Sequence, residues 1–211
     1  MNRIKNSYGK YSEKVLVGGL LGCKGDAYNG EKVMTINESY EFHQYQTIQF
    51  EKQNIDYFFA GIMPEINEAI GIAKAMAETR TPYIISFMIN KNGSVLDGTA
   101  ISDAIKMIDK QVKPRPAFYM TNCIHPTNLI EALNNIKNRK SSQLKRFRGI
   151  QANASILSCE ELDNCNILQQ DDFHNIIEEM YFLQMYFDLK IFGGCCGTND
   201  EFIENLAKEL T

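Results

Sequence analysis

The sequence predicts an α/β fold with a parallel sheet, and three observations support this. Short apolar runs alternate with segments whose apolar residues recur about every 3.6 positions, as on one face of a helix. Each run is short and aliphatic, which is typical of strands buried on both faces. The order strand–helix repeats six times, and this alternation produces parallel sheets. The sheet is either an open, doubly wound one or part of a (β/α) barrel. The chain has 211 residues, whereas a full eight-fold barrel takes about 250.

The strand and helix boundaries follow from these patterns. The position of Pro64 and Pro126 suits a first helical turn, and Thr198–Glu201 resembles a capping box before the last helix. The predicted strands are Val15–Leu20, Ile55–Ala60, Tyr83–Met88, Pro116–Thr121, Arg148–Ala154 and Leu189–Gly193. The predicted helices are 37–53, Ile66–Ala77, Ile101–Ile108, Leu129–Ile136, Phe173–Leu183 and Phe202–Leu210, of which 37–53 has poor periodicity.

Composition and charge narrow the class of protein. Hydrophobic residues make up 44% of the chain, enough for one core, so we expect a single domain over residues 1–211. The formal charge of −4 and the lack of a long basic tract argue against nucleic acid or an anionic membrane as partner. Apolar runs such as Tyr57–Met63 are far shorter than the roughly 20 residues of a membrane span. Residues 1–14 form a polar N-terminal segment without an apolar signal core, which favours a cytoplasmic location.

Cysteines mark the candidate site. Six cysteines without a secretion signal indicate reduced thiols, available for metal binding or catalysis. Cys123 follows one predicted strand, and the adjacent Cys195 and Cys196 follow another. Catalytic groups of parallel α/β folds gather at the carboxyl ends of strands. Three thiolates there would suit Zn²⁺ and leave a fourth position open. The neighbouring glycines Gly193, Gly194 and Gly197 would keep crowding side chains away from two adjacent ligands.

Other interpretations of the cysteines stay open at this point. Adjacent cysteines in a glycine-rich turn are also found as small buried residues or as a strained disulfide. A thiol redox protein that uses Cys195 and Cys196 is a further alternative. Without a close-spaced C-x-x-C pair, spacing alone does not decide between them.

Several segments together resemble the homocysteine S-methyltransferase family. The first signal is Gly193-Gly-Cys-Cys-Gly197 after a strand, with Asn122-Cys123 after an earlier one. Further segments occur in the family's order, so the resemblance covers roughly residues 15–210. They are Val17-Gly-Gly-Leu-Leu-Gly22, Val95-Leu-Asp-Gly-Thr99, Gly149-Ile-Gln-Ala-Asn-Ala-Ser155 and Cys159-Glu-Glu-Leu-Asp163.

The resemblance implies a zinc-dependent (β/α)8 barrel of the TIM type that methylates homocysteine to methionine. Cys123, Cys195 and Cys196 match the family's three zinc ligands. Homocysteine would take the open position as a thiolate and attack an activated methyl group. The donor needs a good leaving group, as in a sulfonium, a quaternary ammonium or a methylated pterin. Asn122 and Asn153 are candidates for orienting the substrate, with loop capping as the alternative.

The chain departs from the family pattern in two places. It begins near the third barrel strand, so the first two βα units are expected to be missing and about six to remain. The stretch Gly61-Ile-Met-Pro64 has glycine where the family's substrate-binding glutamate stands. These departures favour the alternative of an inactive or fragmentary paralogue that keeps the fold or zinc site and acts through a partner. An open barrel exposes two strand edges, which a homo-oligomer or a complementing N-terminal fragment would cover.

The remaining polar residues carry weaker predictions. His125, at a helix entry, is near enough to Cys123 to be a fourth ligand or an acid–base group, but we expect it to be a surface residue. His43 and His174 are expected to face solvent on their helices. Asp97 is expected to form a turn or a cap. Cys23 is expected to pack in the core, although it follows a strand and could line the same rim.

Overall fold

The computed structural model describes residues 1–29, 33–163 and 165–210, so Thr211, the last residue of the predicted domain, lies outside it. Six parallel strands form one sheet in the order β1-β2-β3-β4-β5-β6. Each strand pairs with the next one along the chain, which is the arrangement of a (β/α) barrel. The strands are β1 (Gly18–Leu21), β2 (Tyr57–Met63), β3 (Tyr83–Phe87), β4 (Phe118–Ile124), β5 (Phe147–Ala152) and β6 (Ile191–Gly194).

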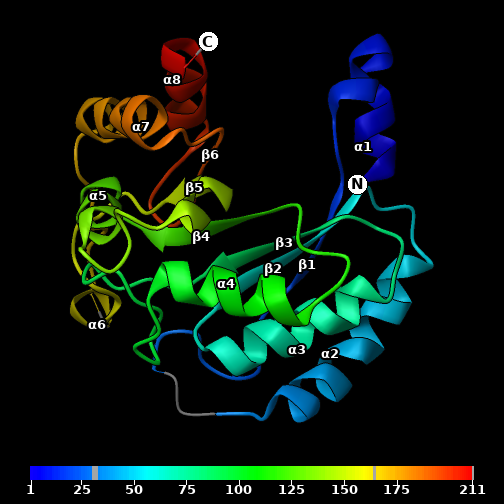
Figure 1. The fold of residues 1–211 in the computed structure, drawn as a ribbon. Helices are drawn as coiled ribbons and strands as arrows, with labels where there is room; N and C mark the ends of the chain where they lie inside the picture. Colours follow the sequence, from blue (N-terminus) through cyan, green and yellow to red (C-terminus); the bar gives the residue numbers. More distant parts are fainter. Residues whose placement is uncertain (30–32, 164, 211) are drawn as a thin grey trace.

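Helices follow the strands and cover one face of the curled sheet, which gives an incomplete barrel of the TIM type (Figure 1). Several neighbouring helices contact each other around this outer face. None of the helices in the described ranges combines the length and apolar character needed to cross a membrane. The helices are α1 (Asn2–Ser7), α2 (Ile36–Glu51), α3 (Ile66–Ala77), α4 (Ile101–Gln111), α5 (Pro126–Asn134), α6 (Cys159–Leu162), α7 (Phe173–Phe187) and α8 (Asp200–Leu210), with 3-10 turns η1 (Gly9–Lys14) and η2 (Ser142–Arg146).

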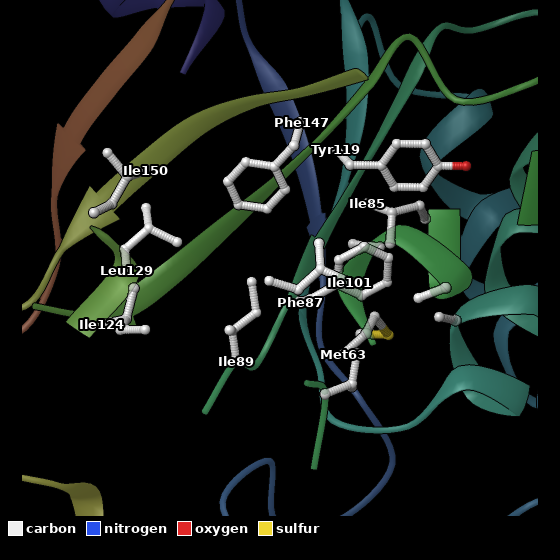
Figure 2. Packing of buried hydrophobic residues seen from close by; sticks show 14 of the residues in the cluster. Met63, Ile85, Phe87, Ile89, Ile101, Tyr119, Ile124, Leu129, Phe147 and Ile150 are labelled. Atoms are coloured by element: carbon white, nitrogen blue, oxygen red, sulfur yellow. The ribbon is translucent and has the colours of Figure 1, made fainter. Parts of the chain in front are cut away.

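The core lies between the sheet and these helices. All five residues of β3 are buried, which agrees with a strand covered on both faces. Phe87 stacks on Tyr119 of the next strand with ring centroids 5.6 Å apart, and Phe147 extends the layer (Figure 2). Such aromatic pairs add to the free energy gained by burying their area. The core therefore fixes the relative positions of β3, β4 and β5, and β4 carries Cys123 near its far end.

A buried polar cluster closes the amino-terminal end of the sheet. The Tyr119 hydroxyl donates a hydrogen bond to Asp109 Oδ1 at 2.9 Å, and Arg146 Nη1 lies 3.2 Å from Asp109 Oδ2. Burial and the neighbouring Asp109 carboxylate raise the pKa of Tyr119 well above its ordinary value. The tyrosine therefore stays a neutral donor, and the cluster ties α4 to β4 and η2.

Several predicted helix ends differ from the observed ones by a few residues, and three of them show the reason. The helix expected to reach Ile136 ends at Asn134, which leaves Ile136 69% exposed. Pro64 lies before α3 and not in its first turn, since Glu65 is the N-cap. The last helix is capped by Asn199, whose Oδ1 accepts the Phe202 N–H at 2.9 Å, and not by Thr198. In each case a local turn or a side-chain hydrogen bond to the backbone replaces the helical hydrogen-bond pattern and sets the boundary.

Candidate metal centre

Three cysteine sulfurs converge at the carboxyl-terminal edge of the sheet. Cys123 lies near the end of β4, and Cys195 and Cys196 directly follow β6. These strands flank β5 in one parallel sheet, so their ends meet at the same rim. The three Sγ atoms all lie within 4.8 Å of one another. The parallel topology thus brings together the three residues that the sequence singled out.

Two of the three sulfurs are bonded to each other. Cys123 and Cys195 form a disulfide with Cα atoms 5.6 Å apart, and Cys196 is a free thiol whose Sγ lies 3.6 Å from that of Cys123. The disulfide therefore does not join the adjacent Cys195 and Cys196, which the thiol redox alternative would use. Reduction of this bond leaves three thiols directed at one point.

The backbone turns Cys123 toward this point. Its φ of 58° lies in the left-handed region, which residues other than glycine seldom adopt. The pairing between β4 and β5 shifts between Asn122 and Ile124, on either side of the cysteine. Irregularities of this kind redirect a side chain and occur next to functional sites. The strand end is thus shaped to present the Cys123 sulfur.

Glycines make the tight turn after β6 possible. A Cβ atom on Gly194 would lie 2.1 Å from Thr198 Oγ1, and one on Gly197 would lie 2.8 Å from Ala154 Cβ. Gly197 also has a φ of 78°. Gly193 differs, because an added Cβ would make only an ordinary contact at 3.4 Å with Gln151 Cγ. Two of the three predicted glycines are therefore required by close approach, and the third is not.

The sulfur positions fit a zinc ion. A tetrahedral site with Zn–S bonds of about 2.3 Å places its sulfurs about 3.8 Å apart, close to the 3.6 Å between Cys123 and Cys196. Thiolate sulfur is also the donor that zinc sites use most. Among the described residues, no His, Asp or Glu joins the group of three cysteines. Three protein ligands leave a fourth position for a substrate or water.

One side of the cluster is apolar. Cys123 packs in a small buried group with Ala27, Ile62 and Met88. Cys23 packs against this group, as expected, and burial together with the Glu68 charge raises the pKa of its thiol to about 11. At neutral pH Cys23 is therefore protonated and acts as a packing residue beside the cluster.

The two asparagines lie beside the cluster, and each uses its oxygen within the protein. Asn122 Oδ1 accepts a hydrogen bond from the Ser86 hydroxyl at 2.5 Å. Asn153 is buried, and its Oδ1 accepts the Ser155 backbone N–H at 3.1 Å. The Asn153 bond is the loop capping that was the alternative to substrate binding. The amide NH₂ group of each side chain has no hydrogen-bond acceptor in the described part of the chain.

The prediction that His125 is a surface residue is wrong. Its side chain is 5% exposed and caps α5, where Nδ1 accepts the Thr127 backbone N–H at 3.3 Å. Asp171 and Glu179 approach the ring at 3.4 and 3.7 Å. Burial lowers the pKa of His125, against the opposing effect of these carboxylates. The sequence did not reveal this cluster, because Glu179 belongs to α7, far along the chain.

The prediction that His43 faces solvent is also wrong, whereas His174 is exposed as expected. His43 Nε2 lies 3.0 Å from Glu68 Oε1, and both side chains are buried between α2 and α3. The same carboxylate oxygen accepts the Lys24 backbone N–H at 2.6 Å. The pair thereby anchors the segment that carries Cys23.

Asp97 forms a cap, as predicted. Its two oxygens accept the backbone N–H groups of Ile66 and Thr99 at 2.7 and 2.8 Å. It therefore fixes the start of α3 and the turn after β3.

The family model for homocysteine S-methyltransferase matches residues 1–210. Among solved structures, the homocysteine methyltransferase MmuM from Escherichia coli is similar in three forms. The apo form has a TM-score of 0.72 at 16% identity, covering 99% of this chain and 68% of that one. The metallated form has a TM-score of 0.74 at 17% identity, and the match covers 98% of this chain and 65% of that one. The oxidised form has a TM-score of 0.74 at 16% identity, and the match covers 100% of this chain and 66% of that one.

This chain thus spans about two-thirds of the length of the MmuM structures. No curated protein sequence matches it. At such low identity the structural similarity bears on the fold, and the family model carries the assignment because it covers almost every residue. The six-stranded barrel architecture, the cysteine cluster and this match agree. The chain belongs to the homocysteine S-methyltransferase family.

Proposed function

We propose that this protein transfers a methyl group from an activated donor to the thiol of homocysteine, giving methionine, and that it depends on zinc. The observation that carries the proposal is the convergence of the Cys123, Cys195 and Cys196 sulfurs within 4.8 Å at the rim of the sheet. Membership of the family supports the reaction class. The proposed partners are therefore homocysteine and a small methyl donor.

The three cysteines, once reduced, are the proposed zinc ligands. Bound zinc lowers the pKa of a coordinated thiol, which supplies a thiolate nucleophile at neutral pH. Transfer joins the methyl carbon to the homocysteine sulfur, and the donor keeps the electron pair of the bond that breaks. A sulfonium, a quaternary ammonium or a methylated pterin can each leave in this way.

Other residues of the chain orient the reactants in this proposal. Ala27, Ile62 and Met88 pack around Cys123 and keep water away from one side of the cluster. Asn122 and Asn153 are proposed to donate hydrogen bonds from their amide groups to the substrate, since their oxygens already accept from Ser86 and Ser155. An ordered nucleophile in a water-poor site is what methyl transfer requires.

Zinc content and methionine formation test the proposal together. Reduced wild-type protein should contain about one zinc per chain, and Cys195→Ser should lose it, because two sulfur ligands bind zinc far more weakly than three. Zinc-loaded protein should then form methionine from homocysteine with at least one of the three donor classes. Folded, reduced protein that takes up no zinc would contradict the proposal.

A second candidate is a catalytically inactive or fragmentary paralogue that acts through a partner. Gly61, at the place where the family resemblance leads us to expect a glutamate, favours it. A Cβ on Gly61 would lie 2.5 Å from the Phe59 ring, so a side chain there requires the ring to move. Bound zinc without methionine formation from any donor class would support this candidate over the enzyme.

The open sheet supports a partner in either case. β1 and β6 are the edge strands of the described sheet, and Leu20 on β1 and Leu16 just before it are 63% and 64% exposed. A second copy or a complementing N-terminal fragment would cover this surface. Light scattering after size exclusion tests for a homo-oligomer, which must exceed the 24.1 kDa of one chain. We propose the cytoplasm as location, since its reducing conditions keep the three thiols free.

A further inference from the structure

A pocket of about 360 Å³ opens beside the cysteine cluster. Its wall includes Cys123, and the rest comes mainly from the segments that follow β3, β4 and β5, with Tyr28 from the segment after β1. This volume lies within the range of small-molecule sites, about 300–1,000 Å³. The pocket therefore offers space for a substrate whose sulfur reaches the cluster.

Two opposite charges line this pocket. Lys91 comes from the loop after β3, and Glu161 from α6 after β5. Glu161 Oε2 accepts the Ser158 backbone N–H at 2.8 Å, which holds the carboxylate in place. Hydrogen bonds from Ser158 and the positive charge of Lys91 keep the pKa of Glu161 below its ordinary value. The wall thus carries one carboxylate that is held in place and one lysine side chain.

An amide group adds to these charges. The Asn90 side chain lines the same pocket and is half-buried, and it makes no hydrogen bond to the described part of the chain. By contrast, Asn92 and Asn128 in the same wall are bonded to Ser94 and to the Ile156 carbonyl. Asn90 is therefore available to a ligand, whereas its neighbours stabilise the loops.

A second part of the cluster's surroundings is apolar. There Cys123 packs with Ala27 and with Ile62 of β2, whereas Met88 of the same group lines the pocket. The inner face at the end of β2 presents Gly61 and the Phe59 ring. Buried ammonium and carboxylate groups need ionic or hydrogen-bonding partners, so a zwitterion is not stabilised on this side.

We infer that the pocket binds the α-amino acid group of homocysteine, with Glu161 facing its ammonium and Lys91 and Asn90 facing its carboxylate. This inference rests on the proposed function. It assigns recognition of the acceptor to the segments after β3 and β5, and not to position 61 at the end of β2. Lys91 and Glu161 are therefore specificity-determining residues, and the thiol chemistry itself remains with the cysteines.

Calorimetric binding to the zinc-loaded protein tests the inference with three thiols. L-homocysteine carries both charges, 4-mercaptobutyrate lacks the ammonium, and 3-aminopropanethiol lacks the carboxylate. Glu161→Gln should weaken homocysteine binding about five- to tenfold and leave 4-mercaptobutyrate unchanged. Lys91→Met should weaken homocysteine binding to a similar extent and leave 3-aminopropanethiol unchanged.

Matched controls remove the same charges elsewhere. Glu131→Gln on α5 and Lys106→Met on α4 are exposed and do not line the pocket. Both should bind homocysteine like wild type. Equal homocysteine affinity in all four variants would overturn the inference while leaving the proposed function intact. Wild-type protein that loads zinc and binds none of the three thiols would overturn both.

Discussion

Cys123 and Cys196 place their sulfur atoms 3.6 Å apart, although 73 positions separate them in the sequence. The proximity follows from the strand order, since β4 and β6 are both neighbours of β5 and end at the same rim. The left-handed backbone of Cys123 and the glycine turn after β6 complete it. The geometry of the centre therefore depends on a few backbone positions as much as on the thiols.

Removal of the Cys196 sulfur should abolish stoichiometric zinc binding without unfolding the protein. Cys196 is an exposed thiol at the cluster, so Cys196→Ser removes a ligand and leaves the core intact. Elemental analysis of reduced protein and a circular dichroism melt measure the two effects. The matched control is Cys165→Ser, an exposed thiol outside the cluster, which should keep the zinc. Equal zinc loss in both variants would count against the three-cysteine site.

Gly197→Ala should destabilise the protein by about 1–2 kcal/mol, the cost of a left-handed conformation for a residue with a Cβ atom. Its φ is 78°, and the new methyl group would also press on Ala154 at 2.8 Å. Gly193→Ala is the control, since its Cβ makes only an ordinary contact. Urea unfolding of both variants checks the prediction, which fails if the two midpoints are the same.

Glu68→Ala should lower the free energy of unfolding by about 3 kcal/mol, as expected when buried hydrogen-bonding groups lose their partner. The substitution leaves His43 and the Lys24 N–H without their shared acceptor. Chemical denaturation measures the loss. Glu41→Ala, on the exposed face of α2, should change stability little. A loss in Glu68→Ala no greater than in this control would show that the pair adds nothing.

Stability should depend on Asp56 at neutral pH and not in strong acid. Hydrogen bonds from Lys5 at 2.9 Å and from the Val17 N–H at 2.7 Å hold the pKa of Asp56 below its ordinary 3.8. A carboxyl whose pKa is lower in the folded state stabilises the protein above 3.8, and this contribution disappears as the pH falls through the folded value.

Urea midpoints of wild type and Asp56→Asn at several pH values check this sign. The variant should be less stable at pH 7, and the gap should narrow as the pH falls below about 3.8. Lys5→Met removes the other partner and should show a smaller gap with the same trend, because the Val17 hydrogen bond remains. A gap that widens in acid would contradict the assignment.

Much of the fold could be predicted from local pattern. The run Tyr83–Met88 became the fully buried β3, and the stripe from Ile101 to Ile108 became the buried face of α4. These predictions succeeded because burial on one face imposes a period that the sequence records directly. The family resemblance extended them from a parallel sheet to an incomplete barrel. The residues at which helices begin and end followed less closely from the pattern. Ile136 lies beyond the end of its helix, and Asn199 instead of Thr198 caps the last one.

The buried polar groups could not be predicted in this way. His43 lies on a helix of poor periodicity, and its burial depends on Glu68 of the next helix. His125 was predicted to be a surface residue, because nothing near it in the sequence indicates burial. Its neighbours Asp171 and Glu179 come from segments about 50 residues away. A polar side chain is buried only when partners satisfy it, and those partners are fixed by packing.

By itself the sequence determined the alternation of strands and helices, the identity of the three cysteines and the glycines that keep their turn open. These are properties of residue type and short-range spacing. Only the tertiary structure decided that the sulfurs meet and that Cys123 pairs with Cys195. It also placed Lys91 and Glu161 on the wall of one pocket. The physical reason is that distances between segments far apart in the chain are set by strand order and packing, which act between elements and not within them.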